Sequence, residues 1–233
     1  MFYPYRYGFS MDSGYLLVLI AAALSFMASI WVNSTFSKYS RVPSSKTGAQ
    51  AARHVLDANG LQHVRIERVP GNLSDHYDPR TNVVRLSEST YDSKSTGAVG
   101  VAVHEVGHAI QHNKGYAPAK LRQVIVPAVN LCSQLAMPLL LIGFLLRMSG
   151  LIWLGIILFS ASLIFALVTL PVEFNASRRA VKTMEKDSYF TAADVAGSKQ
   201  VLTAAASTYL ASAFVSLAQL LRFIGLANRN DRR

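Results

Sequence analysis

The sequence predicts a mainly α-helical membrane protein, with three or four transmembrane helices and a small cytoplasmic domain of helices and short strands. The first observation is a shortage of charge, since 15% of the 233 residues are charged, where about 25% is usual in a soluble domain. The second is that the shortage is concentrated in long apolar runs that alternate with polar segments. The third is the positive charge of those polar segments, which is typical of cytoplasmic loops.

Three uncharged apolar runs are long enough to cross a bilayer. They cover residues 15–32, 124–146 and 151–172, close to the roughly 17–25 residues that a transmembrane helix needs. The first run exceeds the usual apolar core of a signal peptide, about 7–15 residues, so we expect an uncleaved anchor. A fourth run, 201–221, is richer in Ala, Ser and Thr, and the sequence leaves open whether it spans the membrane or lies at its surface.

Positive charge places the two polar segments on one side of the membrane. Residues 33–123 hold 12 Lys and Arg residues, and the segment 173–200 begins with a basic cluster. Under the positive-inside rule both segments are cytoplasmic, and residues 124–172 form a transmembrane hairpin between them. Because both segments face the same compartment, they can build one site although the hairpin separates them in the sequence.

The chain therefore divides into five parts. Residues 1–33 are predicted to form an extracytoplasmic tail and the first transmembrane helix, and residues 34–123 the first cytoplasmic part. Residues 124–172 are the hairpin, residues 173–200 the second cytoplasmic part, and residues 201–233 an apolar C-terminal helix with a basic tail.

Composition restricts the partners and the redox chemistry of the chain. The net charge of +10 favours anionic lipid head groups as partners of a membrane protein over nucleic acid. Cys132 is the only cysteine, so no internal disulfide can form.

The first cytoplasmic part is predicted to contain two helices and two short strands. The first helix is amphipathic and ends at a glycine, which is a common stop signal. Each strand has the alternating polar and apolar residues of a half-buried strand, and a turn-rich loop joins the two. In chain order the elements are a helix over 44–60, a strand over 62–69, a strand over 82–87 and a helix from Ser95 or Thr96 to about Asn113.

The last of these helices carries the motif His-Glu-x-x-His at His104, Glu105 and His108. Histidines four residues apart lie on one helix face, about 6 Å apart along the axis, so their imidazoles can converge on one Zn²⁺. Glu105 projects beside the metal, where it suits a general base acting on a water molecule. The motif predicts a zinc hydrolase, and the structural alternative is a helix with ordinary surface or core histidines.

A zinc site of this kind needs a third protein ligand. His112 continues the spacing, but it lies about 12 Å along the axis from His104, so we expect it to lie outside the ligand set. Glu173 is an isolated acid at the cytoplasmic end of the third apolar run. An acid there is costly unless it is paired or binds a metal. Glu173 is therefore either the third ligand or the partner of Arg178 or Arg179.

Three stretches of the sequence resemble a known family. SDHYDPRTNVVRLSE, VAVHEVGHAIQ and LPVEFNASRRA, in this order and around a membrane hairpin, resemble the YugP-type neutral zinc metallopeptidases, which are bacterial membrane proteins. EFNASRRA is also similar to the Glu-x-x-Ala-Asp segment of HtpX-type membrane gluzincins, with Ser177 in place of the Asp. The resemblance implies a protease of the bacterial plasma membrane with one Zn²⁺ per chain, held by His104, His108 and Glu173.

The resemblance also implies a zincin-like cytoplasmic domain and a polypeptide substrate, including membrane proteins. His76 and Tyr77 are then the candidates for stabilising the oxyanion, and the alternative is that they only order the turn. Val83, Val84 and Arg85 would form an edge strand that accepts an extended peptide, and the alternative is a packing strand.

Two other functions fit parts of the sequence. A zinc-stabilised scaffold or pseudoprotease would need no general base, so Glu105 argues against it. A site-2-type intramembrane protease needs an Asp from another span, and none of the apolar runs contains one.

Overall fold

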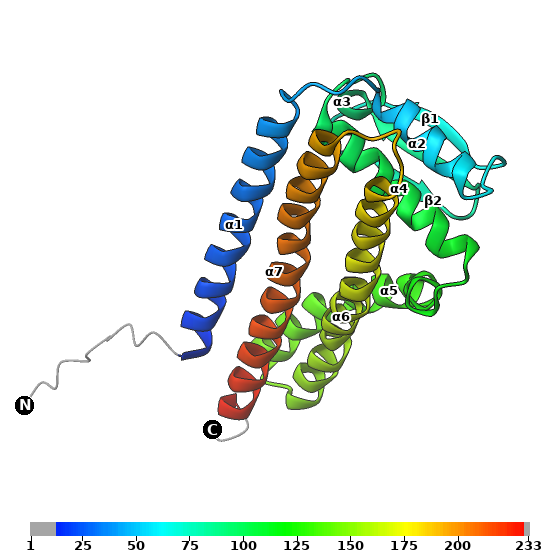
Figure 1. Cartoon of the computed structure of the whole chain (residues 1–233). Helices are drawn as coiled ribbons and strands as arrows, with labels where there is room; N and C mark the ends of the chain where they lie inside the picture. The colour runs from blue at the N-terminus through cyan, green and yellow to red at the C-terminus, as the bar shows by residue number, and fades with distance from the viewer. Residues whose placement is uncertain (1–12, 231–233) are drawn as a thin grey trace, which may run out of the picture.

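The computed structural model describes residues 13–230 and shows long helices with a small unit of short helices and strands beside one end of them (Figure 1). The predicted tail before residue 13 and the last three residues lie outside the described residues. The prediction of a mainly helical chain with a small sheet is confirmed. The elements are α1 (Ser13–Tyr39), α2 (Gly48–Ala58), β1 (Arg65–Val69), β2 (His76–Asp78), β3 (Val83–Ser87), α3 (Glu88–Tyr91), α4 (Thr96–Asn113), α5 (Ala117–Leu146), α6 (Ser149–Glu185) and α7 (Ala192–Asn230).

Four helices of the described chain, α1, α5, α6 and α7, are long and apolar enough to cross a membrane. Most of their apolar side chains are not covered by protein, since between 11% and 17% of the residues in their most apolar windows are buried. Apolar surface on this scale is rare on a soluble monomer and typical of a surface that faces lipid or a partner. The fourth apolar run, which the sequence left open, thus lies in a helix with the length of a transmembrane span.

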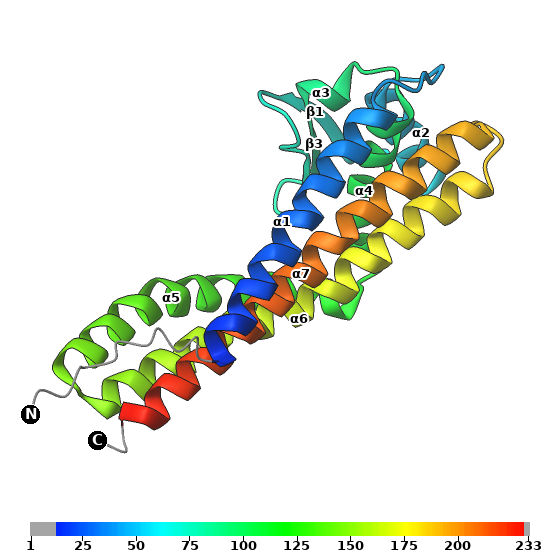
Figure 2. The ribbon, with the colours of Figure 1, turned by 90° about the vertical axis from the view of Figure 1, so that its left-hand side faces the viewer.

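The four long helices run antiparallel to their neighbours in the chain. α5 and α6 form the predicted hairpin, and α7 packs between α1 and α6. Figures 1 and 2 show that the first turn of α1 and the last turn of α7 lie at the same far end, away from the small unit. All four long helices therefore reach beyond the small unit in the same direction, toward this far end.

The small unit contains a three-stranded sheet in the order β1-β3-β2. β1 pairs with β3 in parallel, and β2 pairs with β3 in antiparallel orientation. β2 lies within the segment that was predicted to be a loop. The sequence did not reveal it, because a strand of three residues is too short to show a periodic pattern. One buried apolar cluster joins the sheet to α2, α4 and the adjoining ends of α6 and α7; its members include Val55, Leu56, Val64, Leu86, Val99, Val106, Met184 and Leu202.

Helix α4 is buried on nearly all sides, between the sheet and helices α6 and α7. Ser95, one of the two residues at which the sequence predicted this helix to begin, caps its first turn by accepting a hydrogen bond from the backbone N–H of Ala98. Two glycines allow close contact with its neighbours. A Cβ atom on Gly107 would lie 2.7 Å from the carbonyl oxygen of Ala176 in α6, and one on Gly100 would lie 2.7 Å from Cα of Ser198 in α7. The glycines thus hold α4 close to both helices.

Gly107→Ala is expected to push α4 away from α6, because the new methyl group would collide with backbone rather than with a flexible side chain. Overpacking of this kind costs about 1–3 kcal/mol, so the melting temperature in detergent should fall by several degrees. Gly225→Ala in α7 is the matched control, since a Cβ atom there meets nothing within 4 Å. An unchanged melting temperature for Gly107→Ala would show that the helices are not held at this distance.

Candidate active site

The crossing of α4 and α6 brings three predicted metal ligands together. The Nε2 atom of His104 lies 3.3 Å from Oε2 of Glu173, and Nε2 of His108 lies 3.5 Å from the same oxygen. The three ligand atoms all lie within 4.8 Å of one another. Glu173, which is 65 positions after His108 in the sequence, therefore faces both histidines.

The donor set fits a zinc ion. Oε2 of Glu173 is buried and has no hydrogen-bond partner in the protein, although a buried carboxylate oxygen normally has one. Two ligand atoms bound tetrahedrally at ~2.0–2.1 Å from one ion lie roughly 3.4 Å apart, close to the 3.3 and 3.5 Å that separate Glu173 Oε2 from the two histidines. A cation between these atoms would satisfy the oxygen and both ring nitrogens.

The charge around His108 also favours a cation. Burial by itself lowers the pKa of His108, but the close contact with the Glu173 carboxylate and the negative charge of Glu105 outweigh burial, so the pKa lies above its ordinary value. The two carboxylates thus make this position attractive to positive charge.

Each histidine is oriented by a second polar side chain. Nδ1 of His104 lies 3.2 Å from the hydroxyl of Ser177, and Nδ1 of His108 lies 3.1 Å from the amide oxygen of Gln111. When each Nδ1 donates its proton in these contacts, each Nε2 presents a lone pair toward Glu173. Ser177, which replaces the Asp of the HtpX-type segment, is thus in contact with a ligand.

Gln111 connects the two helices that supply the ligands. It is fully buried, and its amide nitrogen donates to the carbonyl of Val172 at 2.8 Å and to the side-chain oxygen of Asn175 at 3.0 Å. These bonds fix α4 against the turn of α6 that carries Glu173. Gln111 was not among the residues that the sequence predicted for the site. The available signal was a polar residue three positions after His108 in an apolar helix.

Gln111→Leu is expected to weaken zinc binding about 10–100-fold, the usual effect of removing a partner of a ligating histidine. The affinity can be measured by competition with a chromophoric chelator. Gln62→Leu is the control, because Gln62 bonds to the carbonyl of Asp57 on the exposed surface. Equal zinc affinity in Gln111→Leu and wild type would contradict the orienting role.

Arg122 of α5 is the charged partner of Glu173. Its Nη1 atom donates to Oε1 of Glu173 at 2.8 Å, so one carboxylate oxygen faces the arginine and the other faces the histidines. The suggestion that Glu173 pairs with Arg178 or Arg179 is wrong: Arg179 donates to Asn175, and Arg178 lines a groove between α6 and α7.

A cavity of about 330 Å³ opens over the three ligand side chains. Glu105, which is itself buried, lines this cavity. His112 also lines it but lies outside the ligand cluster, in agreement with the helix geometry. Further polar lining residues come from β2 and the residue before it, from α5 and from α7; they are Asp75, His76, Tyr77, Arg122, Gln123 and Tyr209.

Comparison with known proteins identifies the family. The family model described as "Putative neutral zinc metallopeptidase" matches residues 14–228, which is nearly the whole chain. The chain belongs to this family. A protein of Bacillus subtilis (strain 168) named "Putative membrane protease YugP" is 51% identical over 210 residues, which cover 89% of this chain and 93% of the relative. No solved structure matches the chain significantly.

The family membership confirms the resemblance seen in the sequence. The family name implies zinc, and the His104, His108 and Glu173 cluster agrees with that metal. The relative's name and the four apolar helices both indicate a membrane protein.

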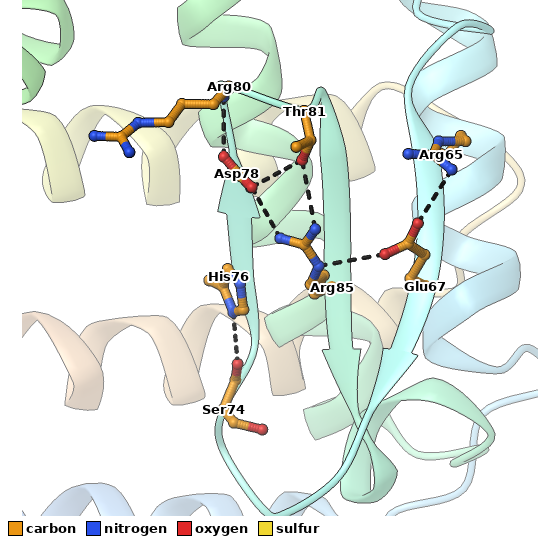
Figure 3. Close-up of polar contacts among 8 residues, drawn as sticks. All are labelled: Arg65, Glu67, Ser74, His76, Asp78, Arg80, Thr81 and Arg85. Atoms are coloured by element: carbon orange, nitrogen blue, oxygen red, sulfur yellow. Dashed lines mark hydrogen bonds and ion pairs between the residues drawn. The ribbon is translucent and has the colours of Figure 1, made fainter.

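The two residues predicted for the oxyanion lie at the cavity in this family member, in different environments. The Tyr77 hydroxyl donates to the side-chain oxygen of Asn82 at 2.9 Å and lies 3.0 Å from Nδ1 of His112. Burial, and then the charge of Asp78, raise the pKa of Tyr77 to about 12, so its proton stays in place at neutral pH. His76 is exposed, and its Nδ1 donates to the carbonyl of Ser74 (Figure 3).

A network of ion pairs holds the turn between β2 and β3 (Figure 3). Hydrogen bonds from the Thr81 side chain, then from Arg85, then from the backbone of Arg80, hold the pKa of Asp78 well below its usual range. Arg85 also contacts Glu67 of β1 at 3.3 Å. Its side chain therefore links all three strands of the sheet.

The prediction that Val83, Val84 and Arg85 form an edge strand is wrong. They lie in β3, the central strand, whose two sides pair with β1 and β2. Val83 and Val84 are fully buried, so no peptide can pair with this strand. The error follows from the missed strand β2, which occupies the edge next to the cavity.

Proposed function

We propose that this chain is a zinc metalloprotease of the bacterial plasma membrane, with Glu105 as the general base. The observation that carries this proposal is the convergence of His104, His108 and Glu173 beneath a cavity that Glu105 also lines. A zinc ion held by these three side chains would act as a Lewis acid toward the scissile carbonyl and lower the pKa of water.

Glu105 supplies the proton transfer in this mechanism. Its carboxylate takes a proton from the attacking water while the water oxygen bonds to the carbonyl carbon. When the C–N bond breaks, Glu105 passes that proton to the leaving amine nitrogen. The immediate products are a carboxylic acid and an amine, and Glu105 returns to its starting state. The acid then gives its proton to the amine, which leaves a carboxylate and an ammonium group.

Donors to the oxyanion come from two sides of the cavity. On the sheet side the Tyr77 hydroxyl is held by two side chains, Asn82 and His112, so we assign the role there to His76. On the helix side we assign it to Tyr209 of α7, which lines the cavity and interacts with the Glu173 carboxylate. The Tyr209 hydroxyl can turn toward the carbonyl oxygen of the substrate as negative charge develops on it. A hydrogen-bond donor at that position stabilises the transition state more than the bound substrate.

Tyr209→Phe is expected to lower kcat about 10²–10³-fold while zinc content stays at the wild-type level, because the loss is confined to one hydroxyl donor. Tyr91→Phe is the control, since Tyr91 lines a separate pocket beside α2. Unchanged kcat in Tyr209→Phe would remove Tyr209 from the mechanism.

The substrate is an extended polypeptide that pairs with β2, in a zincin-like arrangement of strand and zinc helix. No strand of residues 13–230 pairs with the outer edge of β2, and His76 and Tyr77 of β2 line the cavity. An edge strand offers its backbone groups to an added strand. A peptide N-methylated next to the scissile bond should therefore be cleaved more slowly than its unmodified counterpart, and equal rates would exclude strand pairing.

The small unit faces the cytoplasm in this proposal, because its membrane-proximal ends carry Lys38, Arg41, Lys120 and Arg122, and such positive charge is typical of cytoplasmic loops. A reporter protein fused after Arg122 should be active in the cytoplasm. Reporter activity on the outer side of the membrane would reverse the orientation.

Hydrolysis itself is tested with purified protein and casein in water enriched in ¹⁸O. We expect new peptide termini by mass spectrometry, with one ¹⁸O atom in each new carboxyl group. Intact casein after incubation with the zinc-loaded protein would favour the zinc-stabilised scaffold instead.

A further inference from the structure

A second groove, separate from the active-site cavity, lies between α6 and α7. It has a volume of about 520 Å³. Its apolar residues come from both helices and its charged residues are mostly basic. The apolar members are Phe174, Val181, Leu202 and Ala206, and the charged members are Arg178, Lys182, Glu185, Lys186 and Lys199.

The groove lies where the apolar parts of α6 and α7 end. Phe174 follows directly on the third apolar run, and Arg178 comes four residues later, about 6 Å further along the helix. Lys199 comes just before the fourth apolar run. The apolar end of the groove thus points along the lipid-facing part of the helices, and the basic end lies at the level where head groups flank the hydrocarbon core.

The basic side chains of the groove are not neutralised by the rest of the described protein. Within residues 13–230, Arg178, Lys182, Lys186 and Lys199 form none of the ion pairs, and Glu185 is the single acid in the groove. Arg122 and Arg85, by contrast, are both paired with acids. The groove therefore carries a net positive charge next to its apolar residues, which we call the apolar floor of the groove.

We propose that this groove binds one anionic phospholipid. Arg178, Lys182 and Lys199 hold the phosphate group, and an acyl chain lies along Phe174 and Ala206. A free phosphate ion would gain nothing from the apolar floor, and an apolar peptide segment would gain nothing from the basic rim. A lipid with a negative head group matches both, since basic pockets between membrane helices suit such head groups.

The lipid would lie close to the metal ligands. Ser177 lines the groove, and its hydroxyl is 3.2 Å from Nδ1 of His104. The lipid proposal can nevertheless be tested separately from the proposed protease function, because lipid binding is measured without any cleavage assay.

The test uses the full-length protein in uncharged detergent, with phosphatidylglycerol or phosphatidylcholine of identical acyl chains as probes. We expect native mass spectrometry to show one tightly retained phosphatidylglycerol per chain, bound at least tenfold more tightly than phosphatidylcholine. Replacing Arg178, Lys182 and Lys199 together by Gln should abolish this preference. A control with the same loss of charge, Arg65, Arg80 and Lys94 replaced by Gln in the small unit, should keep it.

A second variant tests the apolar floor with all charges intact. Ala206→Phe fills the groove and should lower phosphatidylglycerol retention at least tenfold, while the melting temperature without lipid confirms that the chain is folded. The proposal is overturned if the triple variant and its control bind phosphatidylglycerol equally well. It is also overturned if wild type retains both lipids equally, a result that points to an apolar protein segment as the occupant.

Discussion

Glu173→Gln is expected to bind zinc at least 10³-fold more weakly than wild type. The substitution keeps the shape of the side chain but removes the anionic oxygen that faces both histidines. It also leaves Arg122 without its acidic partner at 2.8 Å, so uncompensated positive charge would oppose a cation. Because deprotonated ligands supply most of the affinity of such sites, we expect less than about 0.1 zinc per chain after dialysis.

Metal content can be measured by plasma emission spectrometry, with affinity from chelator competition. Glu185→Gln is the matched control, since Glu185 lies at the end of the same helix but outside the ligand cluster. It should keep one zinc per chain. Full zinc content in Glu173→Gln would show that the third ligand is another residue.

Glu105→Gln is expected to keep its zinc and to lose casein cleavage about 10²–10⁴-fold, the usual contribution of a general base. An amide cannot accept the proton of the attacking water, but it fits the same buried space beside His104. The loss should appear in kcat rather than in KM, because Glu105 acts on the water and not on the peptide.

Glu88→Gln is the control for Glu105→Gln, since Glu88 lies on the small unit in an ion pair with Arg68. Cleavage at the wild-type rate by Glu105→Gln would exclude Glu105 as the base. Loss of zinc in the same variant would instead place Glu105 among the metal ligands.

The elements that the sequence predicted well are those with long, regular patterns. The uncharged runs correspond to α1, α5, α6 and α7, and Ser95 caps α4 as expected. The spacing of His104 and His108 predicted two ligands, and the isolation of Glu173 in an apolar stretch marked it as a candidate for the third. Each of these signals depends on local geometry or on the cost of burying charge. The family resemblance, and not the spacing, favoured Glu173 as a ligand over Glu173 as an arginine partner.

The features that the sequence did not reveal depend on tertiary contacts. β2 has three residues and no period, so the strand order and the central position of β3 could not be predicted. Tyr209 is one of ten tyrosines, and only the packing of α7 beside α6 brings it to the cavity. Arg122 is one of the 12 basic residues of the segment 33–123, but its contact with Glu173 requires α5 to lie beside the end of the third apolar run.

The central claim is that one zinc ion, held by His104, His108 and Glu173, makes this chain a peptidase. The most direct measurement is casein cleavage by metal-free protein during stepwise addition of Zn²⁺. The account predicts no cleavage without metal, and a rate that rises linearly and stops rising at one zinc per chain. Cleavage that is the same before and after zinc addition would contradict it.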